Sequence, residues 1–369
     1  MEEIKIGDPI LEVKDLSMSF ETTRGTLKAI RGVNFSLRKG ETVAIVGESG
    51  SGKSVTVKAV VGILSNNQLV DGGEILYSYI DGGEKKTVDL LKLSKKQIIS
   101  QINGKHIAMV FQDPMTALNP LLTVGNQLVE GLCVHMKMSK PDAWRRGIEL
   151  LTEVGIMEPE LYMKRYPHQL SGGMRQRVVI AIAMSCDPDI LICDEPTTAL
   201  DVTIQAKILE LIQELQRTRS ISVIYITHDL GVVAKVADFV AVMYAGKIVE
   251  RGTAEEIYFS PRHPYTWGLL LSMPDLSTTD TRLYTIAGSP PNLLHKVDGD
   301  AFAVRNAYAL NVDFEEEPPM FAVSDTHEVA SWLEHPDAPE VHMPETLSNR
   351  IAKMRGLSVK EVGADDSRL

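Results

Sequence analysis

The segment from Gly47 to Ser54, GESGSGKS, combines glycines, a lysine and hydroxyl groups in an order that suits phosphate binding. It directly follows the apolar run Val43 to Val46, which predicts a buried strand. Its glycines permit positive φ angles and close approach, so successive backbone N–H groups can point at an anion. The residues that can supply this cradle are Gly47, Ser49, Gly50, Ser51, Gly52, Lys53 and Ser54.

The last residues of this segment carry charge and a possible metal ligand. Lys53 can direct its ammonium group toward the outer phosphates, and the Ser54 hydroxyl is placed to ligate Mg²⁺. Residues 55–64 are expected to form a helix whose N-terminus faces the anion. The alternative is a flexible glycine loop, which does not explain why strand, loop, Lys-Ser pair and helix follow in this order.

An acidic pair follows a second apolar run. The run Asp189 to Cys193 predicts a buried strand, and Asp194 and Glu195 follow at its carboxyl end, where ligands bind in parallel sheets. Asp194 can ligate Mg²⁺ through water, and Glu195 is the candidate base that orients an attacking water. A helix-capping carboxylate is the alternative, but it does not explain an acidic pair after so apolar a strand.

Other polar and aromatic candidates are ambiguous by themselves. His228 follows the expected strand Ile221 to Thr227; alone it would be read as a structural histidine, but beside the other motifs it is a candidate γ-phosphate or water contact. Gln112, after the expected strand His106 to Phe111, is a candidate Mg²⁺ and water contact or a surface glutamine. Phe20 lies between expected strands and could stack on a purine or fill the core.

A second glycine signature, LSGGMRQR, begins at Leu170. Ser171, Gly172 and Gly173 are expected to open a helix that runs to about Ser185 and whose N-terminus is a further anion site. The chain thus has two phosphate-binding helix starts but one lysine-bearing loop. The simplest arrangement is a dimer in which each signature faces the ATP of the other subunit. Together the two signatures predict ATP hydrolysis.

The elements that position these residues predict an α/β protein. Short β-rich runs alternate with amphipathic stretches, which is typical of a parallel sheet covered by helices. Residues 10–46 favour an antiparallel sheet before the glycine loop, and residues 113–168 favour an inserted helical subdomain. We expect a nucleotide-binding domain over residues 1–264 and an acidic C-terminal extension over residues 265–369.

Composition limits the possible partners. The 369-residue chain carries a net charge of −11, which argues against a nucleic-acid partner. Its longest apolar runs, Val178 to Met184 and Phe239 to Ala245, are far shorter than the roughly 20 residues of a membrane-spanning helix, so a membrane role would fall to partner subunits. The cysteines, Cys133, Cys186 and Cys193, are widely spaced and read as reduced thiols of a cytosolic protein.

The motifs together resemble those of ATP-binding subunits of ABC transporters. The matching segments, GESGSGKS, MVFQDP, LSGGMRQR, LICDEP, TTALD and ITHD, lie within residues 10–250. This resemblance implies that Ser171, Gly172 and Gly173 contact the nucleotide of the opposing subunit. It also implies a subunit-coupling role for Asp201, a γ-phosphate contact for His228 and an adenine-stacking role for Phe20.

Longer segments, such as YPHQLSGGMRQRVVIAIA and SPRHPYT, resemble the oligopeptide and dipeptide importer ATPases, in particular the OppD-like subunits. The resemblance implies a peripheral protein on the cytoplasmic face of the membrane. Its expected partners are a second related ATPase in a heterodimer, two permease subunits and, indirectly, an extracytoplasmic peptide-binding protein. Importers of dipeptides, nickel or glutathione remain alternatives, as do an exporter and a soluble ABC ATPase of DNA repair or translation.

The residues after Tyr265 resemble the C-terminal extension of that family. In many members this extension carries cysteines that hold an iron–sulfur cluster. Here the corresponding positions are Asp300, Asn306, Asp313 and Ser331, which are poor ligands for such a cluster. We therefore expect ATP and Mg²⁺ but no iron–sulfur cluster, and an extension that serves folding and dimer contact. The polar stretch 345–369 is expected to be partly disordered.

Overall fold

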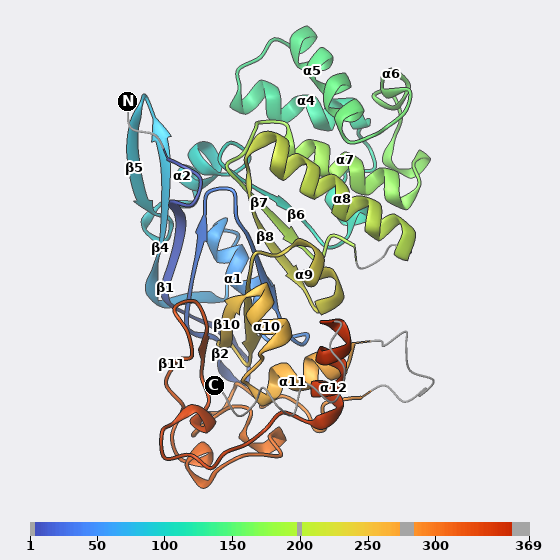
Figure 1. The fold of residues 1–369 in the computed structure, drawn as a ribbon. Helices are drawn as coiled ribbons and strands as arrows, with labels where there is room; N and C mark the ends of the chain where they lie inside the picture. Colours follow the sequence, from blue (N-terminus) through green and yellow to red (C-terminus); the bar gives the residue numbers. More distant parts are fainter. Residues whose placement is uncertain (1–3, 198–200, 274–283, 356–369) are drawn as a thin grey trace.

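The fold was analysed in a computed structural model, which describes residues 4–197, 201–273 and 284–355 (Figure 1). Two sheets form its centre. The first is antiparallel with the strand order β2-β1-β4-β5, and the second is mostly parallel with the order β11-β12-β10-β9-β3-β8-β7-β6. This arrangement confirms the predicted α/β fold with an N-terminal antiparallel part.

The antiparallel sheet is built from long strands whose pairing is set by alternating burial. Its strands are β1 (Pro9–Thr22), β2 (Gly25–Arg38), β4 (Gln68–Asp81) and β5 (Glu84–Asp89). Val13 pairs with Phe35 across β1 and β2, and both side chains are buried. Phe20 lies inside β1, not between strands as the sequence suggested, because β1 continues to Thr22.

The parallel strands of the second sheet are short, mostly apolar and almost entirely buried, as expected where both faces are covered. Strands β6 (Ile107–Val110), β7 (Ile190–Asp194), β8 (Ser222–Thr227), β3 (Thr42–Val46) and β9 (Phe239–Tyr244) run parallel. Strands β10 (Lys247–Thr253), β11 (Phe321–Ala322) and β12 (Glu328–Val329) extend its edge with antiparallel pairing.

Helices cover this second sheet, and a group of them projects beyond it (Figure 1). The helices of the first 236 residues are α1 (Lys53–Val60), α2 (Lys95–Gln97), α3 (Pro114–Ala117), α4 (Val124–His135), α5 (Lys140–Glu153), α6 (Pro159–Tyr162), α7 (Gly172–Met184), α8 (Val202–Arg219) and α9 (Leu230–Val236). Helices α3 to α6 form the inserted helical part between β6 and α7, in the green segment of Figure 1.

The central strand β3 separates two hydrophobic cores. Ala44 and Val46 face the core that includes the inserted helices, whereas Val43 and Ile45 face the core shared with the antiparallel sheet. All four side chains are almost fully buried. Because successive side chains of a strand point to opposite faces, one five-residue strand can join both cores. The glycine loop therefore starts from a rigid support.

The C-terminal part packs beside β10 and includes α10 (Ala254–Phe259), α11 (Pro264–Leu271) and α12 (Glu345–Met354). Of the stretch 345–369 that was expected to be partly disordered, the first residues form α12, whose Leu347 and Ile351 are buried against the large core. The rest of that expectation, residues 356–369, lies outside the described residues. No helix in the described ranges is long and apolar enough to cross a membrane.

Candidate nucleotide site

The glycine loop connects the carboxyl end of β3 to α1 and needs its glycines for backbone reasons. Gly47, Gly50 and Gly52 have φ angles of 153°, 81° and 109°. A Cβ at residue 47 would lie 2.1 Å from the carbonyl oxygen of Met243 on β9, so no larger residue fits. Ser51 has a buried hydroxyl without a hydrogen-bond partner in the described chain, so the loop retains an unused donor.

Lys53 folds back onto the loop that carries it. Its Nζ donates to the carbonyl oxygens of Gly47 at 2.7 Å and Glu48 at 2.9 Å, and its side chain is buried. Burial lowers the pKa of Lys53, while the carboxylates of Glu195, Asp194 and Glu48 oppose this shift. The ammonium group is thus enclosed and faces several negative groups, and a phosphate could replace the two carbonyls as its partner.

Ser54, in the first turn of α1, meets Asp194, the last residue of β7, although β8 lies between β3 and β7 in the sheet. The Ser54 hydroxyl donates to Asp194 Oδ1 at 2.8 Å. Burial raises the pKa of Asp194, and the bond from Ser54 and nearby lysines act in the opposite direction. A hydroxyl and a carboxylate oxygen are the hard ligands that Mg²⁺ prefers beside substrate phosphates. These residues therefore fit a magnesium ion that would also be held by the nucleotide.

Glu195 lies among candidates from three parallel strands. Gln112, after β6, donates from Nε2 to Glu195 Oε2 at 3.0 Å. His228, after β8, has its Nδ1 3.2 Å from Glu195 Oε1. Glu195 itself has a φ of 47°, which is rare for a residue other than glycine and is often found at functional sites. The structure thus brings Gln112, Glu195 and His228 together beside the glycine loop.

The second signature lies apart from these residues. Ser171 caps α7 by accepting from the Met174 N–H at 3.4 Å, and Ser171 and Gly172 are exposed. In the described part of the chain, no hydrogen bond joins residues 171–173 to residues 47–54. Among the described residues, the start of α7 is therefore exposed and separate from the glycine loop.

Asp201 and Phe20 have local roles in the structure. Asp201 caps α8 by accepting from the Ile204 N–H at 2.9 Å. The start of α8 lies next to the second signature, because a Cβ on Gly173 would be 2.9 Å from Ile204 Cγ2. Phe20 is half-buried and packs against the core of the antiparallel sheet.

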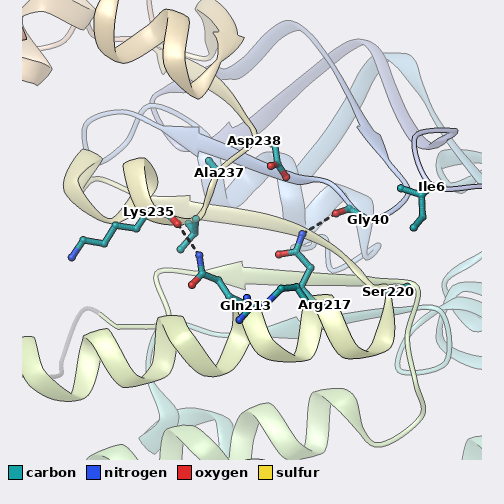
Figure 2. A pocket seen from close by; sticks show the side chains of 10 residues that line it. Ile6, Gly40, Gln213, Arg217, Ser220, Lys235, Ala237 and Asp238 are labelled. Carbon is teal, nitrogen blue, oxygen red and sulfur yellow. Dashed lines mark hydrogen bonds between the residues drawn. The ribbon is translucent and has the colours of Figure 1, made fainter. Parts of the chain in front are cut away.

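A hollow of about 420 Å³ lies elsewhere on the surface (Figure 2). Gln216 donates to Gly40 O at 2.9 Å and Gln213 to Lys235 O at 2.7 Å, as the dashed lines in Figure 2 show. Gly40 precedes β3 and Asp238 precedes β9, so the hollow is at the amino ends of the parallel strands. The hollow therefore lies at the opposite end of the parallel strands from the glycine loop.

Residues far along the chain also reach the glycine loop, and sequence reasoning missed them. Tyr265 of α11 accepts from the Glu48 N–H at 2.8 Å through its hydroxyl. Arg305 of the C-terminal extension forms an ion pair with the Glu48 carboxylate at 2.7 Å. A sequence signal for this contact was the carboxylate at the second position of the loop, which needs a cationic partner when it is partly buried.

The positions that correspond to cluster cysteines are occupied by side chains that each stabilise a local turn. Each accepts a hydrogen bond from a backbone N–H two or three residues away: Asp300 from Phe302 at 3.0 Å, Asn306 from Tyr308 at 2.9 Å, Asp313 from Leu310 at 2.6 Å and Ser331 from Leu333 at 3.3 Å. Oxygen atoms already used in turns do not fit an iron–sulfur cluster. Within the described residues, no group of three or more His, Cys, Asp or Glu could hold a metal ion.

Two family models match the chain. One is described as ABC transporter and matches residues 30–198, and the other is described as oligopeptide/dipeptide transporter, C-terminal region, and matches residues 249–311. With the glycine loop, the acidic pair and the second signature on this fold, the first match defines an ATPase of the ABC class. This confirms the enzyme class expected from the motifs.

Curated relatives identify a narrower group within the ABC class. The chain is 56% identical to the oligopeptide transport ATP-binding protein OppD of Bacillus subtilis, over 96% of this chain and 97% of the relative. It is 55% identical to the dipeptide transport ATP-binding protein DppD of Lactococcus lactis, over 90% of this chain and 93% of the relative. The chain belongs to this family of transport ATP-binding proteins, as the resemblance of its motifs indicated.

Solved structures support the same fold. The ATP-binding cassette MJ0796, solved as a dimer in a post-hydrolysis state with ADP and Pi, is 27% identical and has a TM-score of 0.57, covering 66% of this chain and 98% of that chain. The cbiO1 protein of Clostridium perfringens, part of the ABC transporter complex cbiONQ, is 32% identical with a TM-score of 0.56, covering 69% of this chain and 92% of that chain.

Proposed function

We propose that this chain is the ATP-hydrolysing subunit that powers import of oligopeptides across the cytoplasmic membrane. The observation that carries the proposal is the high identity to a peptide-transport ATP-binding protein over nearly the whole chain, C-terminal extension included. A shared extension matters because it lies outside the ATPase motifs common to all ABC proteins. It distinguishes peptide-transport relatives from the rest of the class.

In the proposed site, the residues of the glycine loop bind the phosphates of ATP. Lys53 supplies positive charge, and Ser54, Asp194 and Gln112 would hold Mg²⁺, which neutralises charge on the phosphates when it is bound. Glu195 orients the attacking water and accepts its proton. His228 contacts the γ-phosphate. The observed bonds from Gln112 and His228 to Glu195 support a single catalytic group.

The proposed active form is a dimer that encloses ATP between the glycine loop of one subunit and the signature of the other. Ser171, Gly172 and Gly173 then bind the partner's nucleotide through the N-terminus of α7. Asp201 couples the two sites, and Phe20 stacks on the adenine. The exposed and unpartnered helix start supports this arrangement, as does the dimeric state of the related cassette MJ0796.

The partners follow from the family. We propose that the chain pairs with a second related ATPase and docks on two permease subunits at the cytoplasmic face of the membrane, while an extracytoplasmic protein delivers the peptide. Dipeptide import is the second candidate, because DppD proteins are also close relatives. Nickel or glutathione importers remain weaker candidates.

The test is affinity purification of tagged Glu195→Gln protein from its native membranes with ATP, followed by mass spectrometry. Glu195→Gln should trap the ATP-bound dimer, and the same variant carrying Lys53→Ala is the matched control that cannot retain ATP. Co-purification of two permeases, a second ATPase and a peptide-binding protein supports the proposal. A metal-binding receptor in their place would assign another cargo, and soluble repair or ribosomal proteins would overturn the transport role.

We also propose that the C-terminal extension works without an iron–sulfur cluster. The turn-stabilising roles of Asp300, Asn306, Asp313 and Ser331 support this. Purification under anaerobic conditions, followed by iron and acid-labile sulfide assays and an absorption spectrum, tests it. Stoichiometric iron and sulfide would contradict the proposal.

A further inference from the structure

Glu48, the second residue of the glycine loop, is held by a guanidinium group from the C-terminal extension. Arg305 donates from Nη1 to Glu48 Oε2 at 2.7 Å and from Nη2 to Oε1 at 2.9 Å. Such a two-pronged bond fixes both the distance and the orientation of a carboxylate. The Arg305 side chain is only 4% exposed and that of Glu48 29%, so solvent screens this pair weakly.

Arg305 is itself fixed by groups from both the extension and the ATPase core. Its Nε donates to Ala287 O at 2.9 Å and its Nη1 to the Tyr244 hydroxyl at 3.2 Å. Its guanidinium also lies 5.6 Å from the ring centroid of Tyr244 and 5.9 Å from that of Phe302. An arginine with this many partners has one position, so the carboxylate that it binds is also confined.

The backbone of Glu48 is held as firmly as its side chain. Its N–H donates to the Tyr265 hydroxyl, and its carbonyl oxygen accepts from Lys53. The Glu48 carboxylate is also close enough to Lys53 to influence its pKa. A negative charge at this place opposes binding of a polyanion unless a cation neutralises it, because interactions between nearby charges are strong in a partly buried site.

We propose that Arg305 is a positioning residue for ATP binding, which neutralises Glu48 and holds its carboxylate away from the phosphates. The C-terminal extension thereby becomes part of the nucleotide site of its own subunit. The inference rests on ATP binding by this chain and not on the identity of the cargo. It gives the C-terminal part a role in ATP binding beyond the folding and dimer contact that were expected from the sequence.

A double-mutant cycle on the full-length chain tests this role. The variants are Arg305→Ala, Glu48→Gln and the two combined, and the measured quantities are the Kd for Mg-ATP and the melting temperature. We expect Arg305→Ala to weaken ATP binding roughly tenfold, because it leaves the Glu48 charge uncompensated. The loss should be larger at low salt, where charge repulsion is less screened. Glu48→Gln in the same chain should restore most of the lost affinity.

Glu317→Gln is the matched control. Glu317 also joins the extension to the core, through ion pairs with Arg31 at 3.1 Å and Lys247 at 2.8 Å, but it does not contact the glycine loop. Its removal should leave the Kd for ATP unchanged. A double variant that binds ATP as weakly as Arg305→Ala would overturn the neutralisation role, and so would an unchanged Kd in Arg305→Ala.

A folding defect would be recognised separately. If Arg305→Ala lowers the melting temperature too far for binding measurements, Arg305→Lys keeps the charge without the two-pronged geometry. We then expect weaker ATP binding that Glu48→Gln relieves, and a Kd equal to that of the unmodified chain would contradict the positioning role. Wild-type protein that binds no ATP would instead refute the proposed function itself.

Discussion

At the scale of single residues, the site concentrates its unusual conformations and charges in a few places. Glu195 has a left-handed backbone and holds Gln112 and His228 within hydrogen-bond distance. Lys53 is buried with its ammonium group on loop carbonyls. The confined carboxylate of Glu195 favours a role in catalysis. The enclosed ammonium group of Lys53 favours a role in phosphate binding. Separate variants can test the two roles.

Glu195→Gln should keep ATP binding but slow turnover by roughly 10²- to 10⁴-fold, because the amide cannot accept a proton from water. The amide has the same shape, so the bonds to Gln112 and His228 need not be lost. Phosphate release and ATP affinity should be measured together. Glu214→Gln, an exposed change on α8, is the control. Equal turnover of Glu195→Gln and unmodified protein would refute the role of Glu195.

Lys53→Ala should weaken nucleotide binding itself by about tenfold or more, since it removes a cation from the phosphates. Equilibrium titration with a fluorescent ATP analogue measures this effect. The exposed Lys96→Ala variant removes a lysine of equal size and should bind normally. If both variants bind ATP with the same affinity, the Lys53 ammonium does not contact the phosphates.

At the scale of elements, the extension is joined to the ATPase core through a buried polar cluster on β10. Glu250 is fully buried and accepts from the N–H groups of Arg262 at 2.6 Å and His263 at 3.1 Å. The His327 Nε2 lies 2.8 Å from Glu250 Oε1, next to β12. A buried carboxylate needs each of these partners. The cluster therefore fixes the position of the hairpin formed by β11 and β12 beside β10.

His327→Ala should destabilise the protein by about 2 kcal/mol, because Glu250 would lose a buried hydrogen-bond partner. Urea unfolding followed by circular dichroism measures the change. His342→Ala serves as the control, since His342 has 67% of its side chain exposed and lies 3.7 Å from the exposed carboxylate of Glu340. Equal stability of the two variants would mean that the Glu250 cluster does not hold the hairpin.

At the scale of the whole molecule, the extension covers the β10 edge of the main sheet (Figure 1). Its Arg305 also reaches Glu48 of the glycine loop. The extension buries acidic groups in doing so. Burial raises the pKa of Asp300 to about 6, and the carboxylates of Asp313 and Glu317 add to the shift. Since the folded protein favours the protonated form of Asp300, this carboxyl should increasingly destabilise the fold as the pH rises from its ordinary pKa of 3.8 to about 6, with no further change above that.

Asp300→Asn should therefore stabilise the protein at pH 8 by on the order of 2 kcal/mol, and this gain should shrink as the pH falls from about 6 to about 4 and be small at about pH 3. Asparagine keeps an oxygen that can accept from the Phe302 N–H, so the turn is preserved. Thermal unfolding of both proteins at several pH values measures the difference. Asp337→Asn, at a side chain that is 94% exposed, is the control. A stability difference independent of pH would contradict the assignment.

Much of the fold and site followed from local sequence. Glycines at 47, 50 and 52 and the lysine at 53 require a particular loop, and short apolar runs require buried strands, so motif order alone predicted the sheet and the candidate residues. The conformation of Glu195 and its contacts with Gln112 and His228 could not be read in this way, because they depend on the order β6-β7-β8-β3 in space.

The sequence by itself determined the chemistry available to this protein, because the phosphate-binding and acidic motifs are continuous segments whose function depends on neighbouring backbone groups. Only the tertiary structure decided what the extension contacts. The ion pair between Glu48 and Arg305 joins residues 257 positions apart, and no local pattern marks either as the partner of the other. The pair requires the extension to pack beside the core, and the buried arginine then needs the Glu48 carboxylate to offset the cost of leaving water.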